Sequence, residues 1–183
     1  MYTLFIDTHQ KTNLAIFKDY KVINSKSSSE LKQSTIIMPL LNNLLDECNL
    51  ELNNICEIIV VNGPGSFTGV RLGVTIAKTI AYLKQIPIKT INSLKIKAIM
   101  DGFNNQYYGV KDAKGIYLGT LKNEDINIEY INNSEIKQEN IIIDIDYDYE
   151  KLSEYISKLI SHNPHQVNPL YIKKIEAQKW LEN

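Results

Sequence analysis

The stretch from Ile58 to Leu83, IIVVNGPGSFTGVRLGVTIAKTIAYL, constrains the fold more than any other part of the 183-residue sequence. The continuous apolar run over Ile55–Asn62 predicts a strand buried on both faces. A glycine-rich loop follows, and then a helical pattern. A strand that enters a helix through such a loop is typical of phosphate-binding sites. The first question is therefore whether this loop binds a nucleotide.

The loop has the flexibility that a phosphate cradle requires. Gly63 and Gly65 flank Pro64, so the backbone can turn sharply after the strand. Ser66 or Thr68 can cap the following helix. Together with Asp7 and Thr8, these residues form a candidate phosphate-binding loop, in which we count Asp7, Thr8, Gly63, Gly65, Ser66 and Thr68.

The loop nevertheless lacks the residues of the known phosphate motifs. A P-loop ends in Gly-Lys-Ser/Thr, whereas Val70 and Arg71 follow Gly69 here. The dinucleotide fingerprint places its third glycine three residues after the second, and Thr68 occupies that position. Asp7 could hold Mg²⁺-bound water, as in an ATPase, or it could cap the turn that follows its strand, and we favour the cap.

Small residues recur at every fourth position of the helix, at Gly69, Gly73, Ala77 and Ala81. Each glycine costs the helix about 1 kcal/mol relative to alanine, so a close backbone approach is expected to compensate. The stripe could pack on the protein's own sheet, or it could receive a partner helix. Arg71 would project beside it, suited to a carboxylate or phosphate.

The remaining pattern predicts a β-β-β-α-β-α-β order followed by a second, shorter set of elements. In the first half we expect strands at Tyr2–Asp7, Asn13–Lys18, Lys21–Ser25, Ile55–Asn62 and Gln85–Thr90, with a helix at Glu30–Cys48 that Pro39 kinks or begins. In the second half we expect a helix that Asn92–Ser93 can cap and that runs to about Gly102. Strands are expected at Gln106–Asp112, Ile116–Leu121, Ile126–Ile131 and Ile141–Ile145, and a helix at Tyr149–Ile160.

This repetition predicts two related α/β half-domains, residues 1–91 and residues 92–183, the second of them shortened. The layout is similar to that of the actin-like ATPases, in the ASKHA or RNase H-like fold class, where nucleotide sits between the domains. Layout alone does not decide function.

Composition excludes several function classes. The formal net charge is −1, which argues against a chain-wide basic surface for duplex nucleic acid. Cys48 and Cys56 are too few for a disulfide framework and lack zinc spacing. The N-terminus does not resemble a signal peptide, and no apolar run is long enough to span a membrane. We expect a cytoplasmic protein.

Candidate metal sites are weak. The first long helix contains no histidine. His162 and His165 are separated by Pro164, which makes one helical face unfavourable, and exposed loop histidines explain them better. Asp144–Glu150 begins like a calcium loop but lacks its glycine and final glutamate. We therefore predict no metal and no cofactor. Lys173, Lys174, Lys179 and Trp180 in the tail could touch tRNA, although a solvated tail is the simpler interpretation.

Several motifs carry a resemblance to a known family. GPGSFTGVRLG resembles the signature of the TsaB family, also known as YeaZ, of bacterial threonylcarbamoyladenosine biosynthesis proteins. Weaker matches appear in the right order along the chain, at LFIDTHQ, IIMPLLNNLL, VKDAKGIY and NPLYIKK. Three features depart from the family pattern: Gln33 stands where a histidine is frequent, Lys114 replaces arginine in the Asp-Ala-Arg hairpin, and the second domain is short.

The resemblance implies an actin-like fold and a role in forming N6-threonylcarbamoyladenosine at position 37 of tRNAs that read ANN codons. It implies an accessory subunit that pairs with the catalytic subunit TsaD, with the ATPase TsaE joining them, and that forms a homodimer through an overlapping surface. Contact with tRNA would be indirect. The pairing uses N-terminal helices, so the expected interface comprises Pro39, Leu41, Leu45, Gly69, Val70, Arg71, Gly73, Ala77 and Ala81.

Two other functions remain open from the sequence. A stand-alone actin-like ATPase would use Asp7 and the glycine loop. A peptidase would use Ser66 as nucleophile, but no motif ties a histidine to this serine. We also expect that Gly73→Leu would leave the monomer folded while blocking partner binding, if the stripe is an interface.

Overall fold

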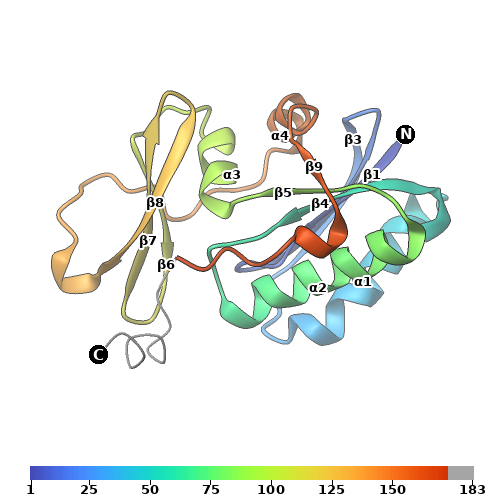
Figure 1. Cartoon of the computed structure of the whole chain (residues 1–183), viewed down its shortest axis with the longest axis horizontal. Helices are drawn as coiled ribbons and strands as arrows, with labels where there is room; N and C mark the ends of the chain where they lie inside the picture. Colours follow the sequence, from blue (N-terminus) through green and yellow to red (C-terminus); the bar gives the residue numbers. More distant parts are fainter. Residues whose placement is uncertain (173–183) are drawn as a thin grey trace.

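The computed structural model describes residues 1–172, and within them two β-sheets organise the chain (Figure 1). The first sheet has the strand order β3-β2-β1-β4-β5-β9, and the second has the order β6-β7-β8. The first sheet comprises β1 (Tyr2–Asp7), β2 (Thr12–Lys18), β3 (Lys21–Ser28), β4 (Ile55–Val61), β5 (Ile88–Ile91) and β9 (Ser161–His162).

The first three strands form an antiparallel meander, and β4 and β5 then add in parallel on the other side of β1. The two-residue turn at Asp19–Tyr20 has positive φ at both positions, the geometry whose twist matches antiparallel strands. The turn at Asn123–Glu124 repeats this arrangement. The predicted β-β-β-α-β-α-β order of the first half is therefore confirmed.

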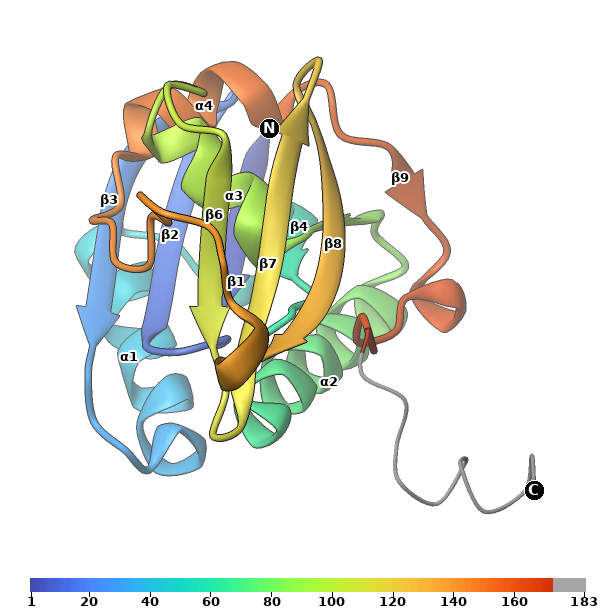
Figure 2. The same ribbon diagram turned by 90° about the vertical axis from the view of Figure 1, so that its left-hand side faces the viewer.

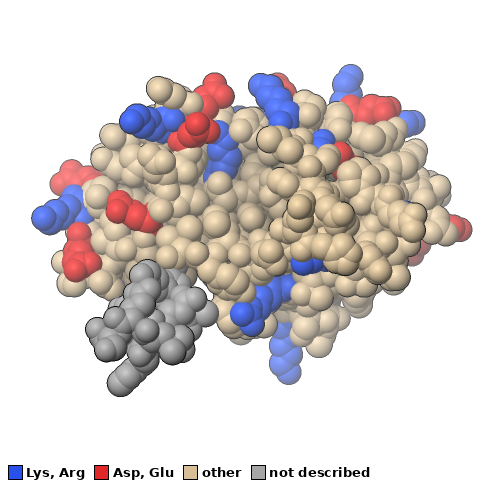
Figure 3. All heavy atoms as spheres, in the orientation of Figure 1, with Lys and Arg blue, Asp and Glu red and all other residues tan. Residues whose placement is uncertain are grey.

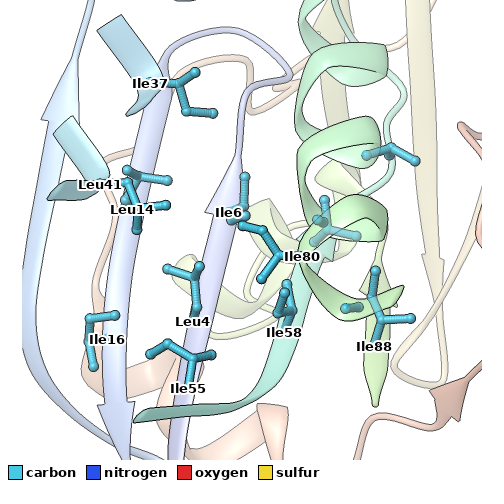
Figure 4. Close-up of a cluster of buried hydrophobic side chains, with 14 of the residues drawn as sticks. Leu4, Ile6, Leu14, Ile16, Ile37, Leu41, Ile55, Ile58, Ile80 and Ile88 are labelled. Carbon is cyan, nitrogen blue, oxygen red and sulfur yellow. The ribbon is translucent and has the colours of Figure 1, made fainter. Parts of the chain in front are cut away.

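Two helices, α1 (Gln33–Glu47) and α2 (Phe67–Lys84), cover one face of the first sheet, below it in Figure 1. Their apolar sides meet the sheet in the largest buried cluster, part of which is drawn in Figure 4. Leu41 from α1 lies against Leu14 of β2, Ile37 lies one turn away on the same helix, and Ile80 from α2 lies near Ile58 of β4. Pro39 lies inside α1 and therefore does not mark its first turn.

The other face of the sheet is covered by α3 (Ser93–Met100) and α4 (Tyr149–Ile156), which pack on Phe5, Phe17 and Ile59. Asn92 caps α3 through its side chain, as the sequence predicted, and Asp148 caps α4. None of the helices in residues 1–172 combines the length and apolar character needed to cross a membrane.

The second sheet packs against α3, in front of it in Figure 2. It consists of β6 (Tyr107–Lys111), β7 (Gly115–Lys122) and β8 (Asp125–Asn132). Short 3-10 turns complete the described chain: η1 (Leu52–Asn54), η2 (Asn133–Glu135) and η3 (Pro164–Gln166).

The main corrections concern the second half. The predicted strand at Ile141–Ile145 is wrong: Ile142 forms only an isolated bridge to Tyr108, and the chain leaves the sheet on either side. The helix α4 ends at Ile156 rather than Ile160. The predicted boundary between two half-domains at residue 91 stays a prediction. The second sheet lies wholly after this residue, but α4 and β9, which also follow it, pack on or pair with the first sheet. The tail residues Lys173, Lys174, Lys179 and Trp180 lie outside the described residues.

Candidate functional site

The turn after β1 lies directly against the N-terminal half of α2. The Thr8 hydroxyl donates to the carbonyl oxygen of Gly69 at 2.6 Å. A Cβ atom added at Gly69 would overlap the Thr8 carbonyl oxygen, and one added at Gly73 would overlap the Thr8 hydroxyl. The glycines of α2 are therefore required by a close approach within this chain.

The glycine loop before α2 is filled in the same way. A Cβ atom at Gly65 would lie 2.5 Å from the carbonyl oxygen of His9, and that oxygen accepts a 2.7 Å hydrogen bond from the Ser66 amide. The Ser66 side chain accepts from the Gly69 amide, so Ser66 is the N-cap and Thr68 is not. The Ser66 amide, which could have faced an anion, thus meets the Thr8–His9 turn instead.

Asp7 sits at the end of β1 and is completely buried. Its carboxylate accepts from the His9 amide at 2.9 Å, from the His9 ring at 2.7 Å and from Asn13. The Tyr147 hydroxyl, from the segment before α4, also donates to it. The interpretation of Asp7 as a turn-capping carboxylate is confirmed by these bonds.

The charges around Asp7 favour its ionised form. Burial raises the Asp7 pKa, but the charge and hydrogen bonds of His9 and the hydroxyl of Tyr147 outweigh it, so the pKa lies below its ordinary value. Burial and then the neighbouring Asp7 raise the pKa of Tyr147 well above its ordinary value. The tyrosine therefore stays protonated as a donor to the carboxylate.

The small-residue stripe packs on the protein's own sheet, which decides between the two alternatives that the sequence left open. Most of the residues expected at the interface are buried in the first sheet's core, which corrects their assignment as contact residues: Leu41, Leu45, Gly69, Val70, Gly73, Ala77 and Ala81. Pro39 and Arg71 remain exposed. The expectation that Gly73→Leu would leave the monomer folded is wrong, because Thr8 occupies the space.

Arg71, the sole arginine of the sequence, forms an exposed cluster with two aromatic residues. Its guanidinium carbon lies 3.8 Å from the centre of the Phe67 ring and 5.6 Å from that of Tyr171. Its Nε donates to the Tyr171 hydroxyl at 2.7 Å. We call Phe67, Arg71 and Tyr171 the Arg71 cluster. Its two aromatic side chains are about half exposed.

The segment before Tyr171 is held on the first sheet, which places the tyrosine beside α2. The Leu170 amide donates to the carbonyl oxygen of Asn62 at 2.7 Å, and Val167 is buried in the core. Sequence reasoning found Arg71 but missed Phe67 and Tyr171 as contact candidates. Both lie in motifs already singled out, GPGSFTG and NPLYIKK, so an exposed aromatic residue in each motif was the available signal.

The surface offers no continuous field of one sign in the view of Figure 3. Lysine, arginine, aspartate and glutamate side chains lie together around the margin of that face, while its centre is largely uncharged. Residues 1–172 contain no group of three or more histidine, cysteine, aspartate or glutamate side chains placed to hold a metal ion. His162 and His165 are both exposed.

Comparison with known proteins places these features in a family. The family model described as TsaD, tRNA N6-adenosine threonylcarbamoyltransferase, matches residues 26–114. The tRNA threonylcarbamoyladenosine biosynthesis protein TsaB of Bacillus subtilis is 38% identical over 100 residues, 54% of this chain and 44% of that protein. TsaB of Buchnera aphidicola from Schizaphis graminum is 35% identical over 97 residues, 52% of this chain and 46% of that protein.

The chain is similar to the TsaB (YeaZ) family over about half of its length. It matches less than half the length of these curated relatives. A tRNA N6-adenosine threonylcarbamoyltransferase of Campylobacter jejuni is 38% identical over 52 residues, 28% of this chain and 16% of that protein.

The fold comparison extends over nearly the whole chain. The structure of YeaZ from Pseudomonas aeruginosa matches with a TM-score of 0.73 at 16% identity, covering 93% of this chain and all of that one. A second Pseudomonas aeruginosa structure, of a protein with similarity to peptidase YeaZ, matches with a TM-score of 0.75 over 94% of this chain and 99% of that one, also at 16% identity. The actin-like α/β fold class expected from the sequence is confirmed.

Proposed function

We propose that the chain takes part in tRNA threonylcarbamoyladenosine biosynthesis as a non-catalytic subunit that binds and activates a TsaD-type transferase. The modified position would be adenosine 37 of tRNAs that read ANN codons. The observation that carries the proposal is the similarity to curated proteins that are named for this biosynthesis.

The local chemistry supports an accessory role. The Asp7 carboxylate accepts from His9, Asn13 and Tyr147, which are the contacts of a structural group. The Thr8–His9 turn fills the glycine loop. The first long helix contains no histidine that could bind a catalytic metal. No observation favours a stand-alone ATPase or a peptidase that uses Ser66.

The Arg71 cluster is the contact surface that we propose for the transferase. Arginine and aromatic side chains are enriched among the residues that dominate binding energy. The Phe67 ring and the Tyr171 hydroxyl already order the Arg71 side chain, so less conformational entropy is lost on binding. Pro39 and the 42%-exposed Met38 lie on α1, which shares the sheet face with α2. We include both at the edge of the proposed surface.

The wider assembly follows from the same proposal. A TsaE-type ATPase would join the complex of the two proteins, and tRNA would contact the transferase rather than this chain. Without the transferase, we expect a homodimer through an overlapping surface. The protein would act in the cytoplasm, where tRNA is modified.

Reconstitution tests the proposed activity. The purified chain, the TsaD-type and TsaE-type proteins of the same organism and unmodified tRNA are incubated with a threonylcarbamoyl donor, and the modified nucleoside is measured by mass spectrometry. We expect product only when the chain is present. Equal product without the chain would overturn the proposal, and ATP turnover by the isolated chain would favour the ATPase alternative.

A further inference from the structure

A pocket of about 400 Å³ lies between the β1–β2 turn, β3, α3 and the segment before α4. This volume is within the range of small-molecule sites. Its walls are mostly charged or polar and carry three lysines, Lys11, Lys26 and Lys97, two aspartates, Asp144 and Asp146, and the side chains of His9, Gln10, Asn13, Ser25, Ser27, Tyr147 and Tyr149. We call it the interlobe pocket. None of the contacts proposed above for the transferase uses it.

Two buried polar atoms at the pocket walls lack hydrogen-bond partners. Within residues 1–172, three buried side-chain atoms are unpaired: His9 Nε2, Thr12 Oγ1 and the Tyr149 hydroxyl. His9 and Tyr149 both line the pocket. An unpaired buried polar group costs roughly 1–3 kcal/mol, so two of them at one cavity indicate a site where a polar ligand completes the bonding.

The His9 ring is oriented by the carboxylate beside it. The Nδ1 atom contacts the Asp7 carboxylate at 2.7 Å. An ionised carboxylate only accepts hydrogen bonds, so Nδ1 carries a proton. The opposite nitrogen, Nε2, is therefore the atom left to bond a ligand. In the imidazolium form it is a donor.

Lys97 supplies a buried positive charge on the same wall. Only 4% of the residue is exposed, and its ammonium group donates to the carbonyl oxygen of Ile143. An ammonium group has three donors, so this bond accounts for one of them. Burial lowers the Lys97 pKa, with partial compensation from Asp144 and Asp7. A second negative group placed close to the ammonium would offset the cost of burying it.

The distribution of charge selects an anion rather than a cation. Asp144 and Asp146 line the pocket but are exposed to solvent, and the Asn13 side chain and the Tyr147 hydroxyl already donate to Asp7. The remaining buried charged or polar groups are Lys97, His9 and the Tyr149 hydroxyl. All three can donate hydrogen bonds, and charge-assisted bonds to an oxyanion are the strongest of this kind. The buried side of the pocket therefore offers the hydrogen-bond donors that an oxyanion requires.

We propose that the interlobe pocket binds a small anion through a carboxylate or phosphate group, held by Lys97, His9 and Tyr149. Because His9 Nε2 and the Tyr149 hydroxyl are closed off from solvent, binding requires a small outward shift of residues 144–148. Residues 143–148 lie outside helices and strands, so such a shift breaks no regular structure.

Calorimetric titration of the whole chain with inorganic phosphate, and separately with succinate, tests the site. We expect saturable binding of at least one probe, and the tighter probe identifies the source of the oxyanion. Lys97→Met should weaken binding about tenfold, and Tyr149→Phe about threefold or more, since each removes a donor. Lys95→Met is the matched control: this buried lysine of the same helix donates to Glu124 on the second sheet, away from the pocket.

NMR of the imidazole nitrogens gives a second readout. The chain has three histidines, so the exposed His162 and His165 serve as internal references while the His9 signal shifts on binding. Should Lys97→Met fail to fold, Tyr149→Phe decides, because it deletes an unpaired hydroxyl. Binding weaker than about 10 mM for both probes, or equal binding by all folded variants, would overturn the proposal.

Discussion

Replacing Gly69 with alanine should destabilise the protein, although alanine is the better helix former. The added methyl group would overlap the carbonyl oxygen of Thr8 and crowd Gln33 at 2.7 Å. The Thr8 oxygen belongs to the backbone of a tight turn, which Asp7 and Ser66 hold through His9. The turn therefore cannot move away from the methyl group at low cost.

The change in the free energy of unfolding follows from one stabilising and two destabilising contributions. Gly69 is in the first turn of α2, so alanine gains at most about 1 kcal/mol in helix propensity. Overpacking against a fixed backbone costs about 1–3 kcal/mol. Displacing Thr8 also weakens its 2.6 Å hydrogen bond to the Gly69 carbonyl, worth about 1 kcal/mol. The net expectation is a loss of about 1–3 kcal/mol in the free energy of unfolding.

Urea denaturation at neutral pH, followed by circular dichroism, measures this loss. Thr75→Ala is the control, because Thr75 is exposed on the same helix and its replacement changes helix propensity without the overlap. It should raise stability by at most about 0.7 kcal/mol. If Gly69→Ala were as stable as the unsubstituted chain, the explanation of the glycine stripe by the Thr8–His9 turn would be refuted.

Three further substitutions test the core and its buried charges by the same denaturation assay. Leu41→Ala should lower the free energy of unfolding by about 2–5 kcal/mol, since Leu41 is buried. A loss under 1 kcal/mol would show that Leu41 is exposed and not part of the core. Lys89→Met should cost about 3–5 kcal/mol because it leaves the buried Glu57 unpaired, 2.9 Å from the former ammonium, and adding Glu57→Met should recover most of the loss. The folded Asp7 pKa lies below its ordinary 3.8, so the unfolded chain binds that proton more tightly and stability falls as pH drops through the folded pKa. Asp7→Asn should reduce the acid slope of the unfolding free energy, and an unchanged slope would contradict the network.

Local signals were sufficient to predict most of the first half. Apolar runs located the strands, and residue type and position narrowed the caps to Ser66 or Thr68 for α2 and to Asn92–Ser93 for α3, of which Ser66 and Asn92 are the caps. These features depend on neighbours within a few residues. The strand predicted at Ile141–Ile145 failed for the opposite reason, because a short apolar run does not distinguish a sheet strand from a segment that crosses a sheet edge.

The local sequence pattern could not predict which part of the structure packs against the glycine stripe. Its spacing was visible, but which partner approaches it depends on Thr8, 61 residues earlier in the chain. Tyr171 reaches Arg71 across 100 residues, and Tyr147 reaches Asp7 across 140. Contacts of this range are set by the complete topology. The sequence therefore identified many of the residues of the candidate site, but the structure was needed to assign their roles.

The contact with the transferase is the central claim, and calorimetric titration of the chain with a TsaD-type transferase of the same organism tests it most directly. Arg71→Ala and Phe67→Ala should each weaken binding roughly tenfold or more. Tyr82→Ala, which removes a similarly exposed aromatic residue at the far end of α2, should leave binding unchanged. Absence of a complex, or equal affinity for all three variants, would contradict the account.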